Sequence, residues 1–543
     1  MAASNGASGA GGSGGVGVTD DVLDYEHGNL EAGTNWWGAF VIGLAGTILV
    51  TGAAPTFLTV FGASYIPIIV FFTLTGVVLC LLLAELSAMM PGRTGGSPSY
   101  AYPAYKDRWP RLAPHVNGLT SWMYWVGWMP VAPLNMILAS FYISERLGLD
   151  TTSGFTPIST FISWWTLGIA IVGLLLLFIP AYLGIRFGTA MATILAVLSM
   201  IPLTFLSIGF IFNVDTVNWS ELAGFHQLDG SSFFSSLDGN PWWLVYLAFA
   251  FPLTWTVIAY EAAACYIGEC KNPARDAKIA MTLEGGYGVF VYTMLPISFV
   301  VVLGASALSN PDLIDPKSMF VTFAGRIFPG AGGELLNWLM AIMLIVALVL
   351  SALNSVMGCS RSLYQMSLDG QFPRFYQHLN KHHVPDRAMM TNIAVSFVIV
   401  FMGGAIEIYS FSNVGYLGSF VPVLIGYYLL RKHRPNVTRP FKLPEYFKWV
   451  ALALAALYFV VWLGGGIAYS FIGDQAIYYF IGWVVAACYL PLYWMRKRED
   501  RKLAARVGLD DGALAPGLVV ATDGLANAGT GAAPGRHAVT EES

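Results

Sequence analysis

Long apolar runs recur along the whole chain, and they restrict its fold more than any other feature. The runs, each of about 20 mainly apolar residues and so long enough to cross a bilayer, lie near 37–61, 65–90, 119–143, 160–183, 188–212, 242–267, 285–307, 335–359, 389–407, 412–430, 448–471 and 476–495. Hydrophobic residues make up 56% of the chain and charged residues only 11%, which excludes a soluble globular protein. The pattern predicts an all-α integral membrane protein with twelve transmembrane helices in the lipid bilayer.

Lysine and arginine are unevenly divided between the loops that join these runs. The loops after even-numbered spans and the tails hold 25 of the 28 basic residues, and only Arg146, Lys317 and Arg326 lie in the opposite loops. Cytoplasmic loops retain positive charge, whereas short external loops avoid it. We therefore expect a multi-pass protein of the cell (cytoplasmic) membrane with both termini in the cytoplasm.

The two ends of the chain contain no apolar run. Residues 1–34 are rich in Gly, Ala and Ser, and residues 497–543 become rich in Ala and Gly after a basic stretch. Compositions with so few large apolar residues cannot bury a core. We expect both segments to be disordered cytoplasmic tails.

Motifs of enzymes and of nucleotide-driven pumps are missing from the sequence. It contains no P-loop, no zinc-ligand spacing such as CxxC and no nucleophile elbow. The net charge of −4 gives no indication of a nucleic-acid partner. The sequence therefore predicts neither an enzyme nor a bound cofactor, and it leaves the oligomeric state open.

Helix-breaking residues interrupt the first and the sixth run. The first contains clustered glycines and Pro55, and the sixth contains Pro252 followed by Glu261. Proline frees backbone carbonyls, and a carboxylate at mid-membrane costs about 2.5–3.5 kcal/mol on insertion scales. Glycine packing or a proline kink explains either span alone. Together, interrupted spans in corresponding positions indicate a transporter built from inverted repeats, with its site at mid-membrane.

Four motifs at the predicted cytoplasmic ends of the spans resemble those of the amino acid–polyamine–organocation (APC) family of secondary transporters. They are AELS with PGRTGGSPSYAY between Ala84 and Tyr102, YE with ECKNPARD between Tyr260 and Asp276, SRSLYQM with DGQFP between Ser360 and Pro373, and LRKHRP with RPF between Leu430 and Phe441. They occur in the family's order and are spread over most of the chain. These motifs identify the chain as similar to the amino acid permeases of this family.

The resemblance implies a fold of five spans, five inverted spans and two additional helices. On this chain it implies a first five-helix repeat over 35–213, a second over 241–430, and helices eleven and twelve over 445–496. It also implies broken helices one and six, and a substrate site between spans one, three, six, eight and ten. A small-molecule substrate, an amino acid or an amine, is the partner that this fold implies.

For span one, the resemblance implies that unwound backbone N–H groups bind the substrate carboxylate. Half-helix N-termini carry partial positive charge and free donors, which agrees with this role. We place the break at 50–55, with Thr51, Gly52 and Ala53 as the donors. The chain departs here from the family's usual GSGIF-like segment.

For span six, Trp255 stands six residues before Glu261, as does the gating tryptophan of an antiporter in this family. An aromatic face over the site can occlude the substrate and attract its ammonium group. Trp255 is then the gate, and Thr256 and Ile258 line the pocket. The alternative is that Trp255 is a packed core aromatic.

Energy coupling is left open by the sequence. Some proton-coupled members of the family carry a lysine in span five, where this chain has Ser199. Glu261 is the titratable candidate for a coupling H+, and the equal alternative is that it bonds backbone freed by the break. A sodium site made of Ser351, Asn354 and Ser355 with carbonyls of span one is less favoured, because serines also pack helices. Exchange requires neither ion.

The charged residues near the predicted site also indicate the class of substrate. Apart from Glu261, we find no acid near the predicted site and no basic residue in a site-forming span, which favours a small neutral amino acid moved by symport or antiport. The alternatives are a polyamine or cationic amine paired with Glu261, and a non-transporting amino acid sensor of the same fold. An ion channel is a weaker rival.

Overall fold

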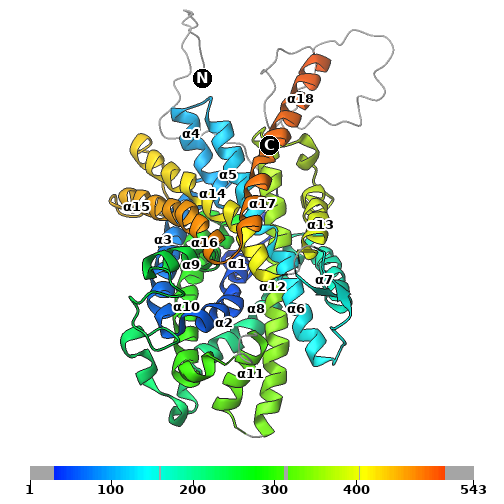
Figure 1. Cartoon of the computed structure of the whole chain (residues 1–543). Helices are drawn as coiled ribbons and strands as arrows, with labels where there is room; N and C mark the ends of the chain where they lie inside the picture. Colours follow the sequence, from blue (N-terminus) through cyan, green and yellow to red (C-terminus); the bar gives the residue numbers. More distant parts are fainter. Residues whose placement is uncertain (1–29, 158–159, 311–315, 330, 403, 508–543) are drawn as a thin grey trace, which may run out of the picture.

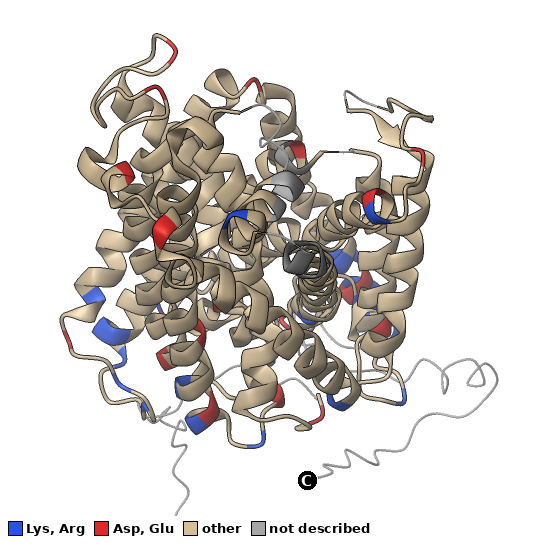
Figure 2. Ribbon diagram, turned by 90° about the horizontal axis from the view of Figure 1, so that it is seen from below, with Lys and Arg blue, Asp and Glu red and all other residues tan. Residues whose placement is uncertain are grey.

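The computed structural model describes residues 30–157, 160–310, 316–329, 331–402 and 404–507, which form a bundle of helices (Figure 1). Only one small hairpin interrupts the helices of the described residues, with β1 (Gly154–Phe155) antiparallel to β2 (Ile162–Ser163). Charged residues occupy a small part of the ribbon (Figure 2). This is the all-α membrane architecture that the sequence predicts.

The first half of the chain forms the helices up to Ser207 and three short 3-10 turns after it. They are α1 (Trp36–Gly43), η1 (Leu44–Leu49), α2 (Val50–Phe61), η2 (Gly62–Ser64), α3 (Tyr65–Met89), η3 (Ser97–Ala101), α4 (Tyr102–Arg108), α5 (Ala113–Trp128), α6 (Val131–Arg146), α7 (Trp164–Tyr182), α8 (Ile185–Ser207), η4 (Gly209–Ile211), η5 (Val214–Thr216) and η6 (Trp219–Phe225).

The second half begins with another broken helix. Its elements are α9 (Trp242–Val257), η7 (Ala259–Glu269), α10 (Pro273–Leu308), α11 (Pro316–Ile327), α12 (Ala331–Leu368), η9 (Arg374–Gln377), α13 (Asp386–Val400), α14 (Ala405–His433), α15 (Phe447–Val460), the π-helical turn η10 (Val461–Gly465), α16 (Gly466–Ile472), α17 (Ala476–Ala487) and α18 (Tyr489–Val507).

Ten helical stretches within the described residues are long and apolar enough to cross a membrane. They are Trp36–Met89, Ala113–Arg146, Trp164–Tyr182, Ile185–Ser207, Trp242–Glu269, Pro273–Leu308, Asn337–Leu368, Glu407–His433, Phe447–Ile472 and Ala476–Arg506. The first holds both the first and the second predicted span, which a turn at Gly62 (φ 58°) separates. The predicted ninth span corresponds to α13, which has only 15 residues. The count of twelve stays a prediction.

The terminal tails lie mostly outside the described residues, and the division into repeats stays a prediction. One boundary changes. Helix α18 continues to Val507, so residues 497–507 are helical and do not belong to a disordered tail. Asp500 anchors this stretch to the bundle, since it pairs with Arg496 and with Arg374, both at 2.8 Å. The rest of the predicted C-terminal tail is not described.

The first span breaks earlier than the sequence predicted. The 3-10 segment η1 covers Leu44–Leu49, while 50–55, the predicted break, is α-helical and includes Pro55. Close packing explains the difference, because a Cβ on Gly46 would lie 2.1 Å from the carbonyl oxygen of Ala259 in η7. Only glycine permits this approach. The position of the break follows a glycine contact between the two broken helices rather than the proline.

The break in the sixth span also lies away from its proline. Helix α9 continues through Pro252 and ends at Val257, after which η7 continues as a 3-10 helix. Thr254 and Thr256 donate to the carbonyls of Ala250 (2.6 Å) and Leu253 (2.8 Å). These bonds satisfy carbonyls near the break, as expected of hydroxyl side chains beside a helix interruption.

The two broken helices lie together inside the bundle. Segment η1 packs against η7, and around them lie α3, α8, α10 and α12. Figure 1 shows α1 within the bundle, with α2 below it. The middle of the bundle is therefore where the chain places its irregular backbone, which lipid does not tolerate but surrounding protein does.

Candidate functional site

Glu261 lies in η7 directly after the break of the sixth span and is fully buried. Its Oε1 accepts hydrogen bonds from the Tyr124 hydroxyl (2.9 Å), the Trp128 indole (3.1 Å) and the Tyr416 hydroxyl (3.0 Å). Its Oε2 accepts one from the Ser97 hydroxyl. All four partners are side chains, and none is freed backbone. The carboxyl group thus ties η7 to η3, α5 and α14.

A small cavity lies beside this carboxyl group. It is lined by residues of α5, η7 and α12, namely Tyr124, Trp128, Ala262, Cys265, Asn354, Ser355, Gly358 and Cys359. Its volume of about 10 Å³ is at the lower limit for one water molecule. An amino acid does not fit in this cavity as it stands.

Trp255 of α9 is not among the residues that line this cavity. It is 2% exposed, and its indole N–H donates to the carbonyl of Gly127 at 3.3 Å. Its ring meets Tyr409 (4.9 Å between centroids) and Tyr416 (6.2 Å) edge to face. Because Tyr416 also binds Glu261, the structure joins the predicted gate and the buried acid through one tyrosine. The gating role itself stays a prediction.

The three predicted backbone donors, Thr51, Gly52 and Ala53, lie in the first turn of α2. The Thr51 hydroxyl donates to the carbonyl of Ile48 at 2.8 Å, within the break. A Cβ on Gly52 would lie 3.2 Å from the Tyr409 hydroxyl. The structure therefore brings this turn to the aromatic group around Trp255, although the break lies before it.

Two predicted pocket residues of span six are placed differently. The Thr256 hydroxyl bonds within its own helix, and Ile258 caps α9 and is fully buried. Neither is among the residues that line the cavity beside Glu261. Their contact with a substrate stays a prediction.

The predicted sodium ligands of α12 already have protein partners. Ser351 accepts a bond from Asn135 (2.9 Å), and Asn354 accepts one from the Tyr266 hydroxyl (2.6 Å). Ser355 donates to a carbonyl at the end of α5 at 2.8 Å. These contacts tie α12 to α6, η7 and α5. They match the packing alternative for these residues, whose ion-binding role stays a prediction.

Two residues of α10 near the breaks, Tyr292 and Glu284, were not predicted from the sequence. The Tyr292 hydroxyl lies 3.3 Å from the carbonyl of Gly46 and 2.8 Å from that of Thr256, so it links the two broken helices. Glu284 is fully buried beside Gly43 and adds an acid that we had not expected there. The predicted seventh span began at 285, which put Glu284 in a loop, but α10 begins at Pro273. The position of Glu284 directly before the apolar run at 285–307 was the signal that could have placed this acid in the membrane.

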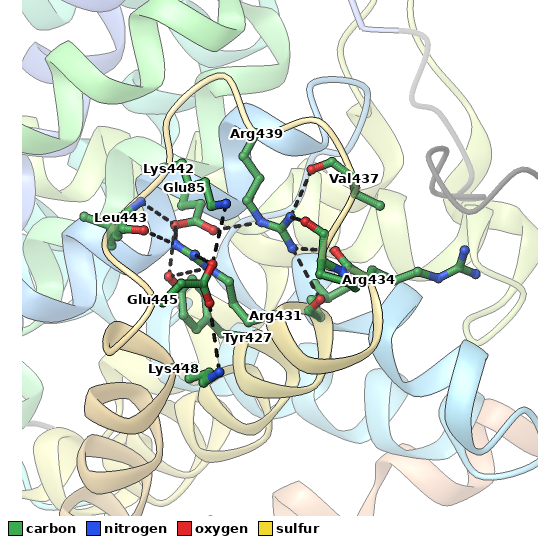
Figure 3. Close-up of polar contacts among 12 residues, drawn as sticks. Glu85, Tyr427, Arg431, Arg434, Val437, Arg439, Lys442, Leu443, Glu445 and Lys448 are labelled. Atoms are coloured by element: carbon green, nitrogen blue, oxygen red, sulfur yellow. Dashed lines mark hydrogen bonds and ion pairs between the residues drawn. The ribbon is translucent and has the colours of Figure 1, made fainter.

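A buried charge cluster lies where α14 ends. Glu85 of α3 binds Arg431 (2.5 Å) and Arg439 (3.1 Å) and accepts a bond from the Tyr427 hydroxyl at 2.9 Å. Figure 3 shows both guanidinium groups beside the Glu85 carboxylate. The cluster joins the first and the fourth motif, because Glu85 belongs to AELS and the arginines to LRKHRP and RPF.

Glu445 forms the exposed rim of this cluster, with its side chain 61% exposed and 3.1 Å from Arg431. Partial burial acts to raise the pKa of Glu445, but the positive charges of Arg431, Lys442 and Lys448 outweigh it. The pKa of this carboxyl is therefore held below its ordinary value. Glu445 stays ionised beside the arginines at neutral pH.

Two more buried ion pairs join the remaining motifs. Arg93 binds Asp369 through both nitrogens (3.1 and 2.6 Å), and Asn117 adds a bond to Asp369 at 3.0 Å. Arg361 pairs in the same two-pronged way with Glu269. All four ionised side chains are at least 96% buried. The motif charges thus bind one another and close the bundle at this end.

A sequence model of the family described as amino acid permease matches residues 35–486. The chain belongs to this amino acid permease family. The APC resemblance is thereby confirmed, and the family is one of transporters rather than enzymes. The match extends from α1 into α17 and includes both broken helices.

Individual relatives are distant. The chain is 27% identical to solute carrier family 7 member 12 of Mus musculus over 42% of its own length and 45% of that protein. It is 24% identical to branched-chain amino acid permease BcaP of Bacillus subtilis (59% and 62%) and 23% identical to L-asparagine permease of Salmonella typhimurium (62% and 65%). In each case the match covers less than two thirds of the relative.

Proposed function

We propose that the chain is a secondary active transporter that moves a small neutral amino acid across the cell membrane by alternating access. The observation that carries the proposal is the small cavity that η7, the broken part of the sixth span, lines together with α5 and α12. The aromatic group of Trp255, Tyr409 and Tyr416 is joined to Glu261, beside this cavity, through Tyr416. Irregular backbone at this depth is kept where it lines a binding site. The family membership supports the same function.

The cavity lining favours a neutral side chain. It consists of aromatic, amide, hydroxyl, thiol and small residues, and neither Lys nor Arg is among them. The names of two relatives, the branched-chain amino acid and L-asparagine permeases, also refer to amino acids with uncharged side chains. A cationic amine would need Glu261 as its partner, but four side-chain donors already occupy that carboxyl group.

Alternating access requires two gates. We assign the outer one to Trp255 and its tyrosines, and the inner one to the buried ion pairs of the four motifs. The end that holds these motifs also carries most of the Lys and Arg residues, so we place it, with both termini, in the cytoplasm. Coupling by H+ or by exchange fits a site in which the predicted sodium ligands bond to protein.

A competition panel tests this function. Proteoliposomes that contain the purified protein are loaded with L-leucine or L-asparagine, and counterflow of the same labelled amino acid is measured. Neutral, acidic and basic amino acids and putrescine are then added as competitors. We expect saturable uptake that neutral amino acids compete for and putrescine does not. Competition by putrescine alone would instead support the amine alternative, and binding without uptake would support a sensor.

A further inference from the structure

Glu284 occupies an unusual place, between the two broken helices. It is fully buried in α10, and neither carboxyl oxygen has a hydrogen-bond partner among the described residues. A Cβ on Gly43 would lie 2.4 Å from its Oε1, so the carboxyl group fills the space where a side chain of α1 would be. On the other side, the backbone N–H of Ala263 in η7 lies within electrostatic reach but makes no geometric hydrogen bond.

Within the described residues, no positive charge acts on this group. The titratable side chains close to it are Glu261 and Cys265 of η7 and Cys80 of α3. Helix α1, segment η1 and helix α2 contain no ionisable residue, and the only one in α8 is Arg186, exposed at its start and paired with Glu31. An ionised carboxylate without partners costs several kcal/mol in such an interior. Enclosure without partners therefore disfavours the ionised form of Glu284.

The two buried acids at the break differ in what holds them. Glu261 is fixed by four donors from three elements. Glu284 has none, and it lies against Gly43, the residue directly before η1, and near the backbone N–H of Ala263 in η7. At the place of the family's span-five lysine the chain has Ser199, whose hydroxyl donates to the carbonyl of Leu195 at 2.6 Å. Among these residues, Glu284 is the one whose charge can change without breaking hydrogen bonds.

We propose that Glu284 is the proton-binding residue of this transporter. It holds a proton while η1 and η7 are packed together. When the two segments separate, water reaches the carboxyl group, the O–H bond breaks, and the proton passes to water while the charge stays on the carboxylate. The proposal rests on the proposed transport function and names its coupling site.

The transport test compares Glu284→Gln with Glu145→Gln, a matched change of an exposed acid at the end of α6. Proteoliposomes are given an inward proton gradient, and L-leucine and L-asparagine serve as probes. One proton per substrate supports accumulation of about tenfold for each pH unit. We expect wild type and Glu145→Gln to accumulate the probes, and Glu284→Gln to equilibrate them while counterflow continues. Proton-driven accumulation by Glu284→Gln, or accumulation that needs sodium, would overturn the proposal.

A second readout needs no transport at all. Infrared spectroscopy of the purified protein reports the C=O stretch of a buried protonated carboxyl group. We expect this band at neutral pH in wild type and in Glu145→Gln. In Glu284→Gln its intensity should fall by the contribution of one carboxyl group, and in Glu284→Asp the band should be shifted but present. An unchanged band in a folded Glu284→Gln protein contradicts the assignment. If no probe is transported by wild type, the proposed function fails, and the band still decides whether Glu284 holds the proton.

Discussion

Trp255 shows how one side chain can join the gate to the buried acid. Its ring packs on Tyr409 and Tyr416, and its indole binds the carbonyl of Gly127. The sequence placed Trp255 and Glu261 six residues apart but did not reveal the tyrosines of α14 between them. Those contacts span more than 100 residues of sequence, and no local pattern encodes them.

We predict that Trp255→Ala impairs both folding stability and occlusion. Removing a buried tryptophan costs about 3–5 kcal/mol, and the space left would let the site leak. Uptake of a labelled neutral amino acid should fall at least severalfold, and the thermal unfolding midpoint should drop. Trp242→Ala, at the half-exposed start of α9, is the control. Equal uptake by Trp255→Ala and the control would remove Trp255 from the gate.

Glu261→Gln should behave differently from the change at Glu284. An amide nitrogen cannot accept hydrogen bonds, so at least one donor among the four partners loses its acceptor, at a cost of about 1–3 kcal/mol. We expect lower thermal stability and slower transport in every mode, including counterflow without a pH gradient. Selective loss of proton-driven uptake, with exchange intact, would instead make Glu261 the proton carrier.

At the scale of elements, the sequence showed which spans are broken but not where. Proline marked the interruption in both spans, and both breaks lie elsewhere, because a helix can carry Pro55 or Pro252 when nearby carbonyls find hydroxyl donors. The actual break in span one follows Gly46, whose partner Ala259 lies in η7, more than 200 residues away in the sequence. Such a contact can be read only from the folded chain. The four motifs could be recognised from the sequence as markers of the family, but the ion pairs between them could not be predicted.

Gly46→Ala tests the contact between η1 and η7. The added methyl group would lie 2.1 Å from a backbone oxygen, which cannot move aside as a side chain can. Overpacking of this kind costs about 1–3 kcal/mol. We predict a lower unfolding midpoint and near loss of counterflow. Gly168→Ala in α7 meets no atom within 4 Å and should leave both unchanged. Normal counterflow by Gly46→Ala would show that the segments need not touch.

Glu85→Gln tests the ion pairs that close the motif end. It removes the buried counter-charge of Arg439 and leaves Arg431 with only the exposed Glu445, and breaking a buried pair costs about 3–5 kcal/mol. We expect destabilisation, and a larger fraction of molecules open at that end in a cysteine-accessibility assay. Glu445→Gln, on the exposed rim of the same cluster, should have a small effect. Similar effects of the two changes would mean that burial of the pair is unimportant.

At the scale of the whole molecule, single side chains hold distant elements together. Tyr416 of α14 bonds to Glu261 in η7 and meets Trp255 of α9, and Glu85 of α3 pairs with Arg431 of α14. Apolar runs and motifs were enough to predict the membrane architecture and the family, since both depend on local composition. These contacts could not be predicted, because they depend on how distant segments meet.

Proton-linked counterflow in proteoliposomes tests the account most directly. Protein in vesicles preloaded with L-leucine or L-asparagine is mixed with the labelled amino acid, with and without an inward proton gradient. The account predicts saturable entry above that of empty vesicles, competition by neutral amino acids, and accumulation that follows the proton gradient. Binding of these amino acids with no entry under either condition would contradict the claim that this chain is a transporter.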